Sequence, residues 1–496
     1  MPKNLILALD QSTSGSKAMV IDSAGKILSS LQKAHKQYYP HPGWVEHDPE
    51  EIYKNAVELL GKALKAAKAD PAGIKALSIT NQRETVLVWD KKTGKPVYPA
   101  IVWQCRRTSG ICMEMKKKGL EELVKERTGL LLDPYFSASK IKWILENVDG
   151  AMEKSRNGEL LLGTIDSWLI WKFTGGKVHA TDYTNASRTM LFNIKTLEWD
   201  NELLGIFGVH ESMLPEVKYS DDLFGTIQEE IIPGPGFPIS GIIGDSQGAL
   251  FGQNCFEPGM IKATYGTGTS VMMYTGKRSI QSKKGLACSI AWGRKGSVDY
   301  ALEGIIISSG DTLNWLKDNI NIISDFDLVD DMAKSLKDNE GVYLVPAFVG
   351  LGVPYWDMEA RAAITGLSRK SNCNNLVRAA LESTAYQVRD AVELMREESG
   401  IKPVMLYADG GMTRSQFAMG FQAGMLGFPV VTTGIEDLSL MGSAYLAGLA
   451  VGIWDDTEEI KTLRRGDSTF LPEMAEDIRK KNYKGWKKAV ENVLTA

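Results

Sequence analysis

Two aspartates stand where apolar stretches of the sequence end. Asp10 follows Leu5–Leu9 directly, and Asp245 follows Ile239–Ile243 after one glycine. A carboxylate at the end of a buried strand is well placed to hold Mg²⁺ through water or to accept the proton of a substrate hydroxyl. A strand-end acid is also a common turn former, so each aspartate taken alone leaves both interpretations open.

Two turns made of small residues are suited to phosphate. Residues 10–17 read Asp-Gln-Ser-Thr-Ser-Gly-Ser-Lys, and residues 265–269 read Tyr-Gly-Thr-Gly-Thr. Backbone N–H groups in such turns can surround an anion, and here hydroxyl groups and Lys17 add donors and charge. A third glycine pair, Gly410-Gly411, stands between an expected strand and a helical stretch, where an adenine base could enter. For either of the first two turns alone, a plain hairpin turn is the commoner explanation.

The sequence lacks three well-known motifs for phosphate binding and acyl transfer. It contains no G-x-x-x-x-G-K-[ST] motif, no G-x-G-x-x-G between a strand and a helix, and no G-x-S-x-G nucleophile elbow. Polar residues 81–85 (Asn-Gln-Arg-Glu-Thr) separate two apolar stretches. Arg83 and Glu84 could bind vicinal hydroxyls there, or form a surface ion pair worth less than about 1 kcal/mol.

Strands and helices alternate around these residues and predict two α/β domains. Asp48 caps an expected helix that has proline at its first position. Each half opens with a strand, a small-residue turn and a second strand, which is weak evidence for duplication. We expect a boundary near Gly252, giving domains 1–252 and 253–496 with a ligand cleft between them. The expected strands are 5–10, 17–22, 26–32, 74–80, 85–89, 239–243, 342–346 and 404–409, and later helices are expected over 375–395 and 439–451.

Composition excludes several classes of partner. The net charge of −4 over 496 residues gives no basic surface for nucleic acid. No apolar run approaches the roughly 18 residues of a membrane span, and the N-terminus does not resemble a secretory signal. The five cysteines are odd in number and lack metal-ligand spacing, which favours a reducing cytoplasm and argues against structural zinc.

The motifs together resemble the FGGY carbohydrate kinase family. Residues 135–147 (Tyr-Phe-Ser-Ala-Ser-Lys-Ile-Lys-Trp-Ile-Leu-Glu-Asn) are similar to its first signature, and residues 362–382 are similar to its second. Residues 41–49, 81–85, 101–107 and 182–190 are most similar to the glycerol kinase branch, and the resemblance extends from about residue 4 to residue 490. The resemblance implies two RNase H-like domains of the actin-like ATPase type, closing on ATP and substrate across a central cleft.

The resemblance also implies roles for individual residues. Asp245 is expected to be the general base, and Asp10 is expected to position Mg²⁺ with Asp245 nearby. The residues expected to bind the nucleotide are Thr13, Ser14, Lys17, Gly266, Thr267, Gly310, Asn314, Gly411 and Ser415. The residues expected to bind the polyol are Arg83, Glu84, Trp103, Tyr135, Asp245 and Ser246. The first domain would thus hold the polyol and the base, and the second the nucleotide.

Several positions depart from the pattern of the glycerol kinase branch. Ser246 stands where glutamine is usual, and Ser270 where phenylalanine usually packs on the glycerol carbons; both changes enlarge the expected pocket. Ser12, Lys17, Asn314 and Ser415 also differ, and Lys17 replaces a forked donor by a point charge. We therefore expect ATP-dependent phosphorylation of glycerol to glycerol 3-phosphate, with a longer polyol or a four- to five-carbon ketose as the alternative acceptor. A catalytically silent sensor on the same fold is a further alternative, and a homo-oligomer (dimer or tetramer) is expected.

Overall fold

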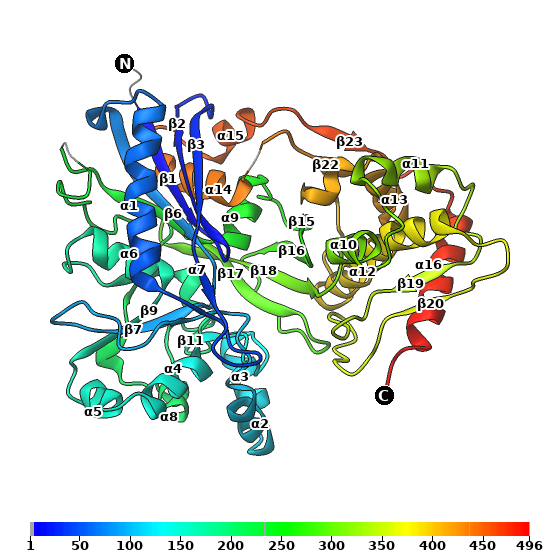
Figure 1. Cartoon of the computed structure of the whole chain (residues 1–496). Helices are drawn as coiled ribbons and strands as arrows, with labels where there is room; N and C mark the ends of the chain where they lie inside the picture. Colours follow the sequence, from blue (N-terminus) through cyan, green and yellow to red (C-terminus); the bar gives the residue numbers. More distant parts are fainter. Residues whose placement is uncertain (1–3, 233–234, 436, 496) are drawn as a thin grey trace.

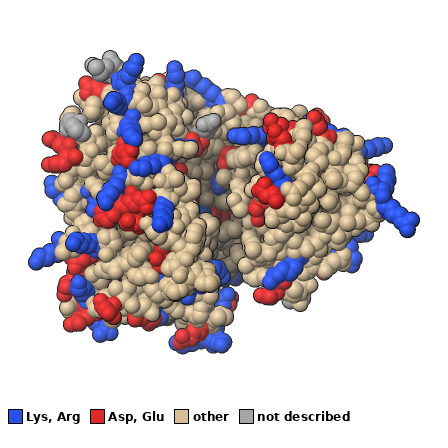
Figure 2. All heavy atoms as spheres, viewed as in Figure 1, with Lys and Arg blue, Asp and Glu red and all other residues tan. Residues whose placement is uncertain are grey.

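The computed structural model describes residues 4–232, 235–435 and 437–495. The chain forms two lobes, each built around a mixed β-sheet, and Figure 1 shows them side by side. A deep hollow separates the lobes on the face drawn in Figure 2, where basic and acidic side chains are interspersed. Within the described residues, no helix is both long and apolar enough to cross a membrane.

The first lobe is centred on a five-stranded sheet with the order β14-β6-β1-β2-β3. Its strands are β1 (Leu5–Gln11), β2 (Gly15–Ile21), β3 (Ile27–Ala34), β6 (Ile74–Asn81) and β14 (Ile239–Gly244). Helices α1 (Pro49–Ala66) and α6 (Ile165–Phe173) cover one face. The Asp48 side chain accepts a hydrogen bond from the N–H of Glu50, which confirms the expected helix cap.

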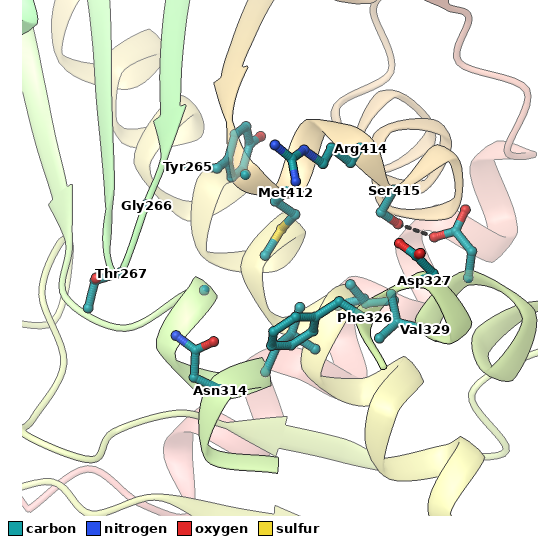
Figure 3. A pocket seen from close by; sticks show the side chains of 15 residues that line it. Tyr265, Gly266, Thr267, Asn314, Phe326, Asp327, Val329, Met412, Arg414 and Ser415 are labelled. Atoms are coloured by element: carbon teal, nitrogen blue, oxygen red, sulfur yellow. Dashed lines mark hydrogen bonds between the residues drawn. The ribbon is translucent and has the colours of Figure 1, made fainter. Parts of the chain in front are cut away.

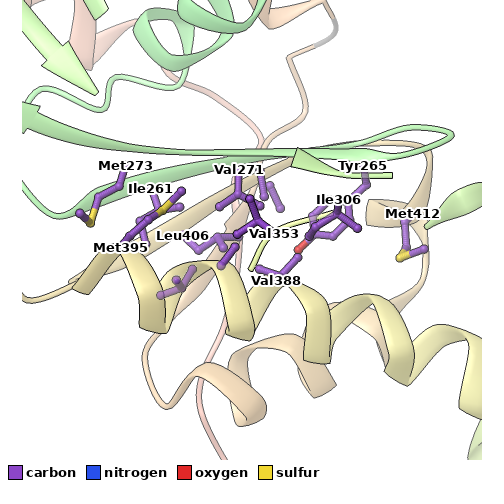
Figure 4. Close-up of a cluster of buried hydrophobic side chains, with 14 of the residues drawn as sticks. Ile261, Tyr265, Val271, Met273, Ile306, Val353, Val388, Met395, Leu406 and Met412 are labelled. Carbon is purple, nitrogen blue, oxygen red and sulfur yellow. The ribbon is translucent and has the colours of Figure 1, made fainter. Parts of the chain in front are cut away.

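The second lobe is centred on a seven-stranded sheet with the order β17-β18-β16-β15-β21-β22-β23. Its strands are β15 (Met260–Tyr265), β16 (Thr269–Gly276), β17 (Ala287–Arg294), β18 (Ser297–Ile306), β21 (Met405–Gly410), β22 (Val430–Thr432) and β23 (Ser468–Phe470). Helix α12 (Cys373–Ser399) lies along one face. Figure 4 shows Val388 and Met395 of this helix packed against Ile261, Val271 and Leu406 of the sheet.

The two sheets repeat one topology. β1 pairs antiparallel with β2 and parallel with β6, and β15 pairs antiparallel with β16 and parallel with β21. β14 then continues the first sheet in parallel, as β22 continues the second. The weak similarity of the two halves in sequence thus corresponds to a shared arrangement of strands, because backbone pairing survives side-chain replacement.

Two helices lie between the lobes. Helix α9 (Asp245–Gly252) begins at the end of β14, and α14 (Leu438–Ala450) packs both on α9 and on the first sheet. The helices approach so closely that a Cβ atom at Gly442 would lie 1.9 Å from the carbonyl oxygen of Gly248. The C-terminal half of the chain therefore returns to cover the first sheet, and the division at residue 252 stays a prediction.

The remaining elements surround these sheets. The other strands are β4 (Gln37–Tyr38), β5 (Glu46–His47), β7 (Val86–Asp90), β8 (Ala100–Ile101), β9 (Leu160–Thr164), β10 (Ala180–Asp182), β11 (Phe192–Asn193), β12 (Glu198–Trp199), β13 (Glu216–Lys218), β19 (Tyr343–Val345) and β20 (Ala363–Thr365). The other helices are α2 (Ser109–Lys117), α3 (Glu121–Thr128), α4 (Ser137–Asn147), α5 (Ala151–Arg156), α7 (Tyr183–Ala186), α8 (Asn201–Phe207), α10 (Gly310–Asp318), α11 (Val329–Lys334), α13 (Gln416–Leu426), α15 (Thr457–Thr462) and α16 (Glu476–Glu491). Short 3₁₀ turns span Pro71–Gly73, Glu211–Met213, Phe326–Leu328 and Gly411–Arg414.

The expected elements are present, and their ends differ for local reasons. The helix expected over 375–395 extends to Cys373–Ser399, because Asn372 forms a capping box at its start and Gly400 adopts the left-handed conformation (φ +66°) at its end. The strand expected over 342–346 spans only Tyr343–Val345, since it pairs with the three residues of β20.

Candidate functional site

The two aspartates lie at one edge of the first sheet. β1, β6 and β14 run parallel, with Asp10 opposite Thr80 and Gly244 opposite Asn81, so their carboxyl ends meet there. Asp245 begins α9, and its Oδ1 lies 3.0 Å from Nε of Arg83 as an ion pair without hydrogen-bond alignment. Burial raises the pKa of Asp10 to about 8, and the charges of Asp245 and Asp437 add to the rise. These carboxylates therefore lie close enough to affect one another.

The donor set at this edge fits a magnesium ion. Oδ1 of Asp10 is buried and has no hydrogen-bond partner among the described residues, which leaves a carboxylate oxygen free for a ligand. The described parts of the chain contain no group of three Asp, Glu, His or Cys side chains placed to hold a metal by themselves. Mg²⁺ is commonly bound by one or two carboxylates together with water and substrate phosphates, and Asp10 with Asp245 meets that requirement.

The turn between β1 and β2 lies beside these carboxylates. Trp103 donates from Nε1 to Oγ1 of Thr13 at 2.9 Å, and Ser14 is exposed at the tip. The ammonium group of Lys17 lies 2.5 Å from Oδ1 of Asp437, which adopts a left-handed conformation (φ +56°). Since Asp437 precedes α14, this ion pair joins the first turn to the C-terminal half of the chain. The turn that carries Thr13, Ser14 and Lys17 thus contacts Trp103, a residue expected to bind the polyol.

The expected polyol residues form a second group next to Asp245. Arg83 and Glu84 are both buried, and the rings of Trp103 and Tyr135 lie 5.3 Å apart. Glu84 holds a left-handed conformation (φ +61°), and its carbonyl oxygen accepts a hydrogen bond from Oγ of Ser137 at 2.9 Å. The alternative that Arg83 and Glu84 form an ion pair on the surface is wrong, because both side chains are buried.

Three charged residues of this group were not expected from the sequence: Arg188, Lys262 and Glu303. The Glu303 carboxylate, on β18, forms ion pairs with Nη2 of Arg83 and Nη1 of Arg188, each at 2.8 Å. Burial alone would raise the pKa of Glu303, but the two guanidinium groups outweigh it and hold the pKa well below its ordinary range. Glu303 stands inside an apolar strand (Tyr-Ala-Leu-Glu-Gly-Ile-Ile), and this isolated charge was the available signal.

Two of the four serines that depart from the glycerol kinase pattern, Ser246 and Ser270, lie at this group. The N–H of Ser246 donates to Oδ1 of Asp245 at 2.6 Å. Oγ of Ser270 donates to Oε1 of Glu303 at 3.3 Å and accepts from Nζ of the buried Lys262 at 3.3 Å. Burial lowers the pKa of Lys262. Ser270 therefore contributes a polar wall where a phenylalanine would contribute an apolar one.

The expected nucleotide residues of the second lobe line one cavity of about 630 Å³, shown in Figure 3. The residues from that prediction are Gly266, Thr267, Gly310, Asn314, Gly411 and Ser415. Gly266 and Thr267 belong to the β15–β16 turn, whose carbonyl oxygens accept from the N–H groups of Gly310 and Ser309 at 3.1 and 3.0 Å. Figure 3 shows the glycine-rich turn on one side of the cavity and Ser415 on the other.

The same cavity has lining residues that were not among the expected nucleotide residues. They are Tyr265, Leu313, Phe326, Asp327, Val329, Asp330, Leu381, Met412 and Arg414. The Asp330 carboxylate accepts a hydrogen bond from the hydroxyl of Ser415 and another from the N–H of Phe417 at 3.0 Å. Ser415 in turn caps α13 by accepting from the N–H of Ala418. Phe326 and Asp330 come from a stretch without a motif, so only the folded chain places them here.

Two actin-like lobes with an acidic edge on one and a glycine-lined cavity on the other define an ATP-dependent sugar or polyol kinase fold. The chain belongs to the FGGY family of carbohydrate kinases. The N-terminal domain of that family matches residues 5–252, and its C-terminal domain matches residues 261–451.

Similar proteins include two curated glycerol kinases and several solved kinases. The chain is 52% identical to "Glycerol kinase" of Caldanaerobacter subterraneus subsp. tengcongensis and 52% identical to "Glycerol kinase 2" of Thermotoga maritima, each time over 99% of this chain and 98% of the relative. The structure of Plasmodium falciparum glycerol kinase with ADP superposes with a TM-score of 0.96 at 38% identity, covering 100% of this chain and 99% of that one. A ligand-bound xylulose kinase from Lactobacillus acidophilus matches with a TM-score of 0.89 over 98% and 97% of the two chains, but at 22% identity it shows the fold alone.

Proposed function

We propose that this chain phosphorylates glycerol to glycerol 3-phosphate with ATP as the phosphoryl donor. The observation that carries the proposal is the placement of Asp245, which lies 3.0 Å from Arg83 at the edge that also holds Asp10. Two glycerol kinases that are 52% identical to this chain over 99% of its length support the choice of glycerol as acceptor.

In the proposed reaction, Asp245 accepts the proton of a primary hydroxyl as that oxygen attacks the terminal phosphorus of ATP, the bond from this phosphorus to the β,γ-bridging oxygen breaks, and ADP leaves. Its side chain is 38% exposed, so a substrate can reach it. A carboxylate in hydrogen-bond reach of an alcohol contributes roughly 10²–10⁴-fold. Arg83 and Glu84 hold the other hydroxyls, and the rings of Trp103 and Tyr135 contact the carbon chain.

The phosphates would lie between the two small-residue turns. Thr13, Ser14 and Lys17 donate to the transferring group, while Gly266 and Thr267 hold the β/γ region, because phosphoryl transfer depends mainly on positioning and charge neutralisation. Asp10 and Asp245 would hold Mg²⁺, which when bound neutralises charge on the phosphate oxygens. Gly310, Asn314, Gly411 and Ser415 then surround the rest of the nucleotide. Closure of the lobes excludes water, which would otherwise compete as acceptor.

The test is a coupled assay of ADP release with Mg-ATP and glycerol. We expect turnover that depends on glycerol, on ATP and on Mg²⁺. ADP release that does not depend on any polyol, or no ADP release at all, would contradict the proposal and favour the catalytically silent sensor.

A second acceptor class is supported by Ser270. Its hydroxyl is bonded to Glu303 and Lys262, so the wall at this position can take a further hydroxyl or a carbonyl group. The assay should therefore include dihydroxyacetone, erythritol, D-ribulose and D-xylulose. A kcat/KM at least tenfold higher for one of the longer acceptors would make that compound the substrate. In that case Ser246→Gln with Ser270→Phe should shift preference back toward glycerol.

The same proposal includes a cytoplasmic location and a homo-oligomer. The five cysteines are free thiols, four of them buried, and a reducing compartment keeps thiols in that state. Light scattering after size exclusion gives the oligomeric state; a monomer at micromolar concentration would contradict that part. We also keep the division into domains 1–252 and 253–496 as a prediction, which limited proteolysis can test.

A further inference from the structure

Four buried charged side chains from both halves of the chain meet beside the expected polyol residues. Nε of Arg188 lies 2.6 Å from Oε1 of Glu84, and Nη1 of Arg188 lies 2.8 Å from Oε2 of Glu303. Nη2 of Arg83 lies 2.8 Å from Oε1 of Glu303. Two cations and two anions therefore share one site, and each glutamate is paired with at least one arginine.

Arg188 is fully buried, and one of its nitrogens has no hydrogen-bond partner in the described part of the chain. Nε donates to Glu84, and Nη1 contacts Glu303 and donates to Oγ of Ser289 at 3.0 Å. Nη2 makes no hydrogen bond within the described residues. A buried guanidinium N–H without an acceptor costs free energy, because it has lost its water and gained nothing in exchange. An oxygen from a bound molecule would recover that cost.

The surroundings of Arg188 indicate which molecule could supply the oxygen. Its guanidinium carbon lies 6.0 Å from the ring centroid of Tyr135 and 5.1 Å from that of Phe136. Tyr135 and Glu84 both belong to the expected polyol group, and Arg188 contacts both. A neutral hydroxyl oxygen suits this position, since Glu84 and Glu303 already balance the charges of Arg83 and Arg188.

We propose that Arg188 is a further acceptor-binding residue, whose Nη2 donates a hydrogen bond to a hydroxyl oxygen of the polyol that is not phosphorylated. The inference rests on the proposed function and assigns part of the selection for glycerol over smaller diols to this side chain. Because a guanidinium does not deprotonate in proteins, Arg188 contributes recognition and not proton transfer.

The experiment compares Arg188→Lys with Arg107→Lys. The Arg107 side chain is also buried in the first lobe, but its guanidinium pairs with Glu46 at 2.6 Å and stacks on Trp44. Arg107→Lys therefore controls for the loss of a buried guanidinium group as such. Kinetics with glycerol are measured together with the inhibition constants of 1,2-propanediol and 1,3-propanediol, each of which lacks one hydroxyl. For Arg188→Lys we expect the KM for glycerol to rise about 10- to 100-fold, while the KM for ATP changes less than about twofold.

The diols separate direct contact from positioning. If Nη2 binds a particular hydroxyl, the diol lacking that hydroxyl loses little affinity in Arg188→Lys, and the other diol weakens as glycerol does. Equal weakening of glycerol and both diols, or the same loss in Arg107→Lys, would overturn the proposal. Should Arg188→Lys fail to fold, a crystal structure of the wild-type enzyme with glycerol decides. A glycerol oxygen within about 3.2 Å of Nη2 supports the inference, and a water molecule there overturns it.

Failure of this inference is distinguishable from failure of the proposed function. Wild-type enzyme that turns over no polyol would refute the function itself. Wild-type enzyme that phosphorylates glycerol while Arg188→Lys keeps the same KM for glycerol would refute only the role of Arg188.

Discussion

The turns that close the first hairpin of each lobe share a backbone hydrogen-bond pattern but are supported by different groups. Residues 12–14 join β1 to β2, and residues 266–268 join β15 to β16. In the first turn the N–H of Ser12 donates to the carbonyl of Gly15 at 2.9 Å, and in the second the N–H of Gly266 donates to the carbonyl of Gly268 at 2.9 Å. One hairpin design is thus used twice, as the shared sheet topology requires.

The difference lies in what supports each turn. The first follows Asp10 and rests on side chains: Nε2 of Gln82 donates to Oε1 of Gln11 and lies 3.3 Å from Nδ1 of His47. The second rests on backbone, and a Cβ atom at Gly268 would lie 2.4 Å from the carbonyl oxygen of Ile306. The first turn is therefore held by side chains, and the second is held by close packing of its backbone against the backbone at Ile306.

Replacing Asp245 by asparagine should have the largest effect, because it removes the proposed general base from the first lobe. We expect kcat with glycerol to fall at least about 10²-fold, while ATP binding in the other lobe stays within a few-fold of wild type. Steady-state kinetics and calorimetry with ATP measure the two quantities. A near-normal kcat would remove Asp245 from the base role.

Gly268→Ala tests whether the second turn depends on backbone approach. The added methyl group meets two carbonyl oxygens, of Ile306 and Ile307, at 2.4 and 2.7 Å, so the turn must shift. We expect the KM for ATP to rise at least about 30-fold, with glycerol affinity less affected. Gly61→Ala is the matched control, since nothing lies within 4 Å of its added Cβ. An unchanged KM for ATP would contradict the proposed phosphate contact.

The first turn alone should be sensitive to mild acid. Burial, together with the nearby His35, lowers the pKa of His47 to about 3. Folded protein therefore keeps this imidazole neutral while unfolded chain takes up a proton below about pH 6.5, so stability is lost as the pH falls. The loss from His47 alone is about 2 kcal/mol by pH 5, while protonation of Asp10, whose pKa is about 8, acts in the opposite direction. Hydrogen exchange at pH 7 and pH 5, compared between wild type and His47→Gln, should show residues 10–17 losing more protection in wild type than in the variant, with no such difference at 264–270.

The histidine prediction has its own control. His47→Gln keeps a polar partner for Gln82 but does not titrate in this range, so the variant should lose the pH-dependent part of the change. Equal loss of protection in both turns, or the same pH dependence in the variant, would show that His47 is not responsible.

Ser415→Ala should have the smallest effect, at the far side of the nucleotide cavity. The change removes the cap of α13 and the hydrogen bond to Asp330, a loss of about 1 kcal/mol. We expect the KM for ATP to rise about three- to tenfold and the KM for glycerol to stay constant. A rise in the KM for glycerol instead would place Ser415 outside the nucleotide site.

Much of the fold followed from local signals. The strand ending at Asp10, the helix capped at Asp48 and the glycine turn at 266–268 are all encoded by neighbouring residues, so periodicity and turn chemistry predict them. Six of the expected nucleotide residues line one cavity. Gly266, Thr267 and Gly411 lie in turns that their glycines mark in the sequence, whereas Gly310, Asn314 and Ser415 were expected only from the family resemblance. The assigned roles of these residues stay predictions.

The residues missed from the sequence share a different origin. Arg188, Glu303 and Asp437 each act through a partner more than 80 residues away in the chain, as in the pair between Arg188 and Glu84 at 2.6 Å. No local pattern distinguishes such a residue from a solvated charge. Only the tertiary packing of the chain shows that it is buried and paired.

The sequence by itself determined the reaction class, since the two strand-end aspartates, the small-residue turns and the family signatures depend on residues close in the chain. The tertiary structure decided how the proposed acceptor site is completed, because Glu303, which is bonded to Ser270 in the second sheet, reaches Arg83 only when that sheet folds against the first. Short-range backbone preferences depend on neighbouring residues and can therefore be predicted from the sequence. The pairing of four buried charged side chains, by contrast, depends on distances between residues far apart in the chain, which only folding sets.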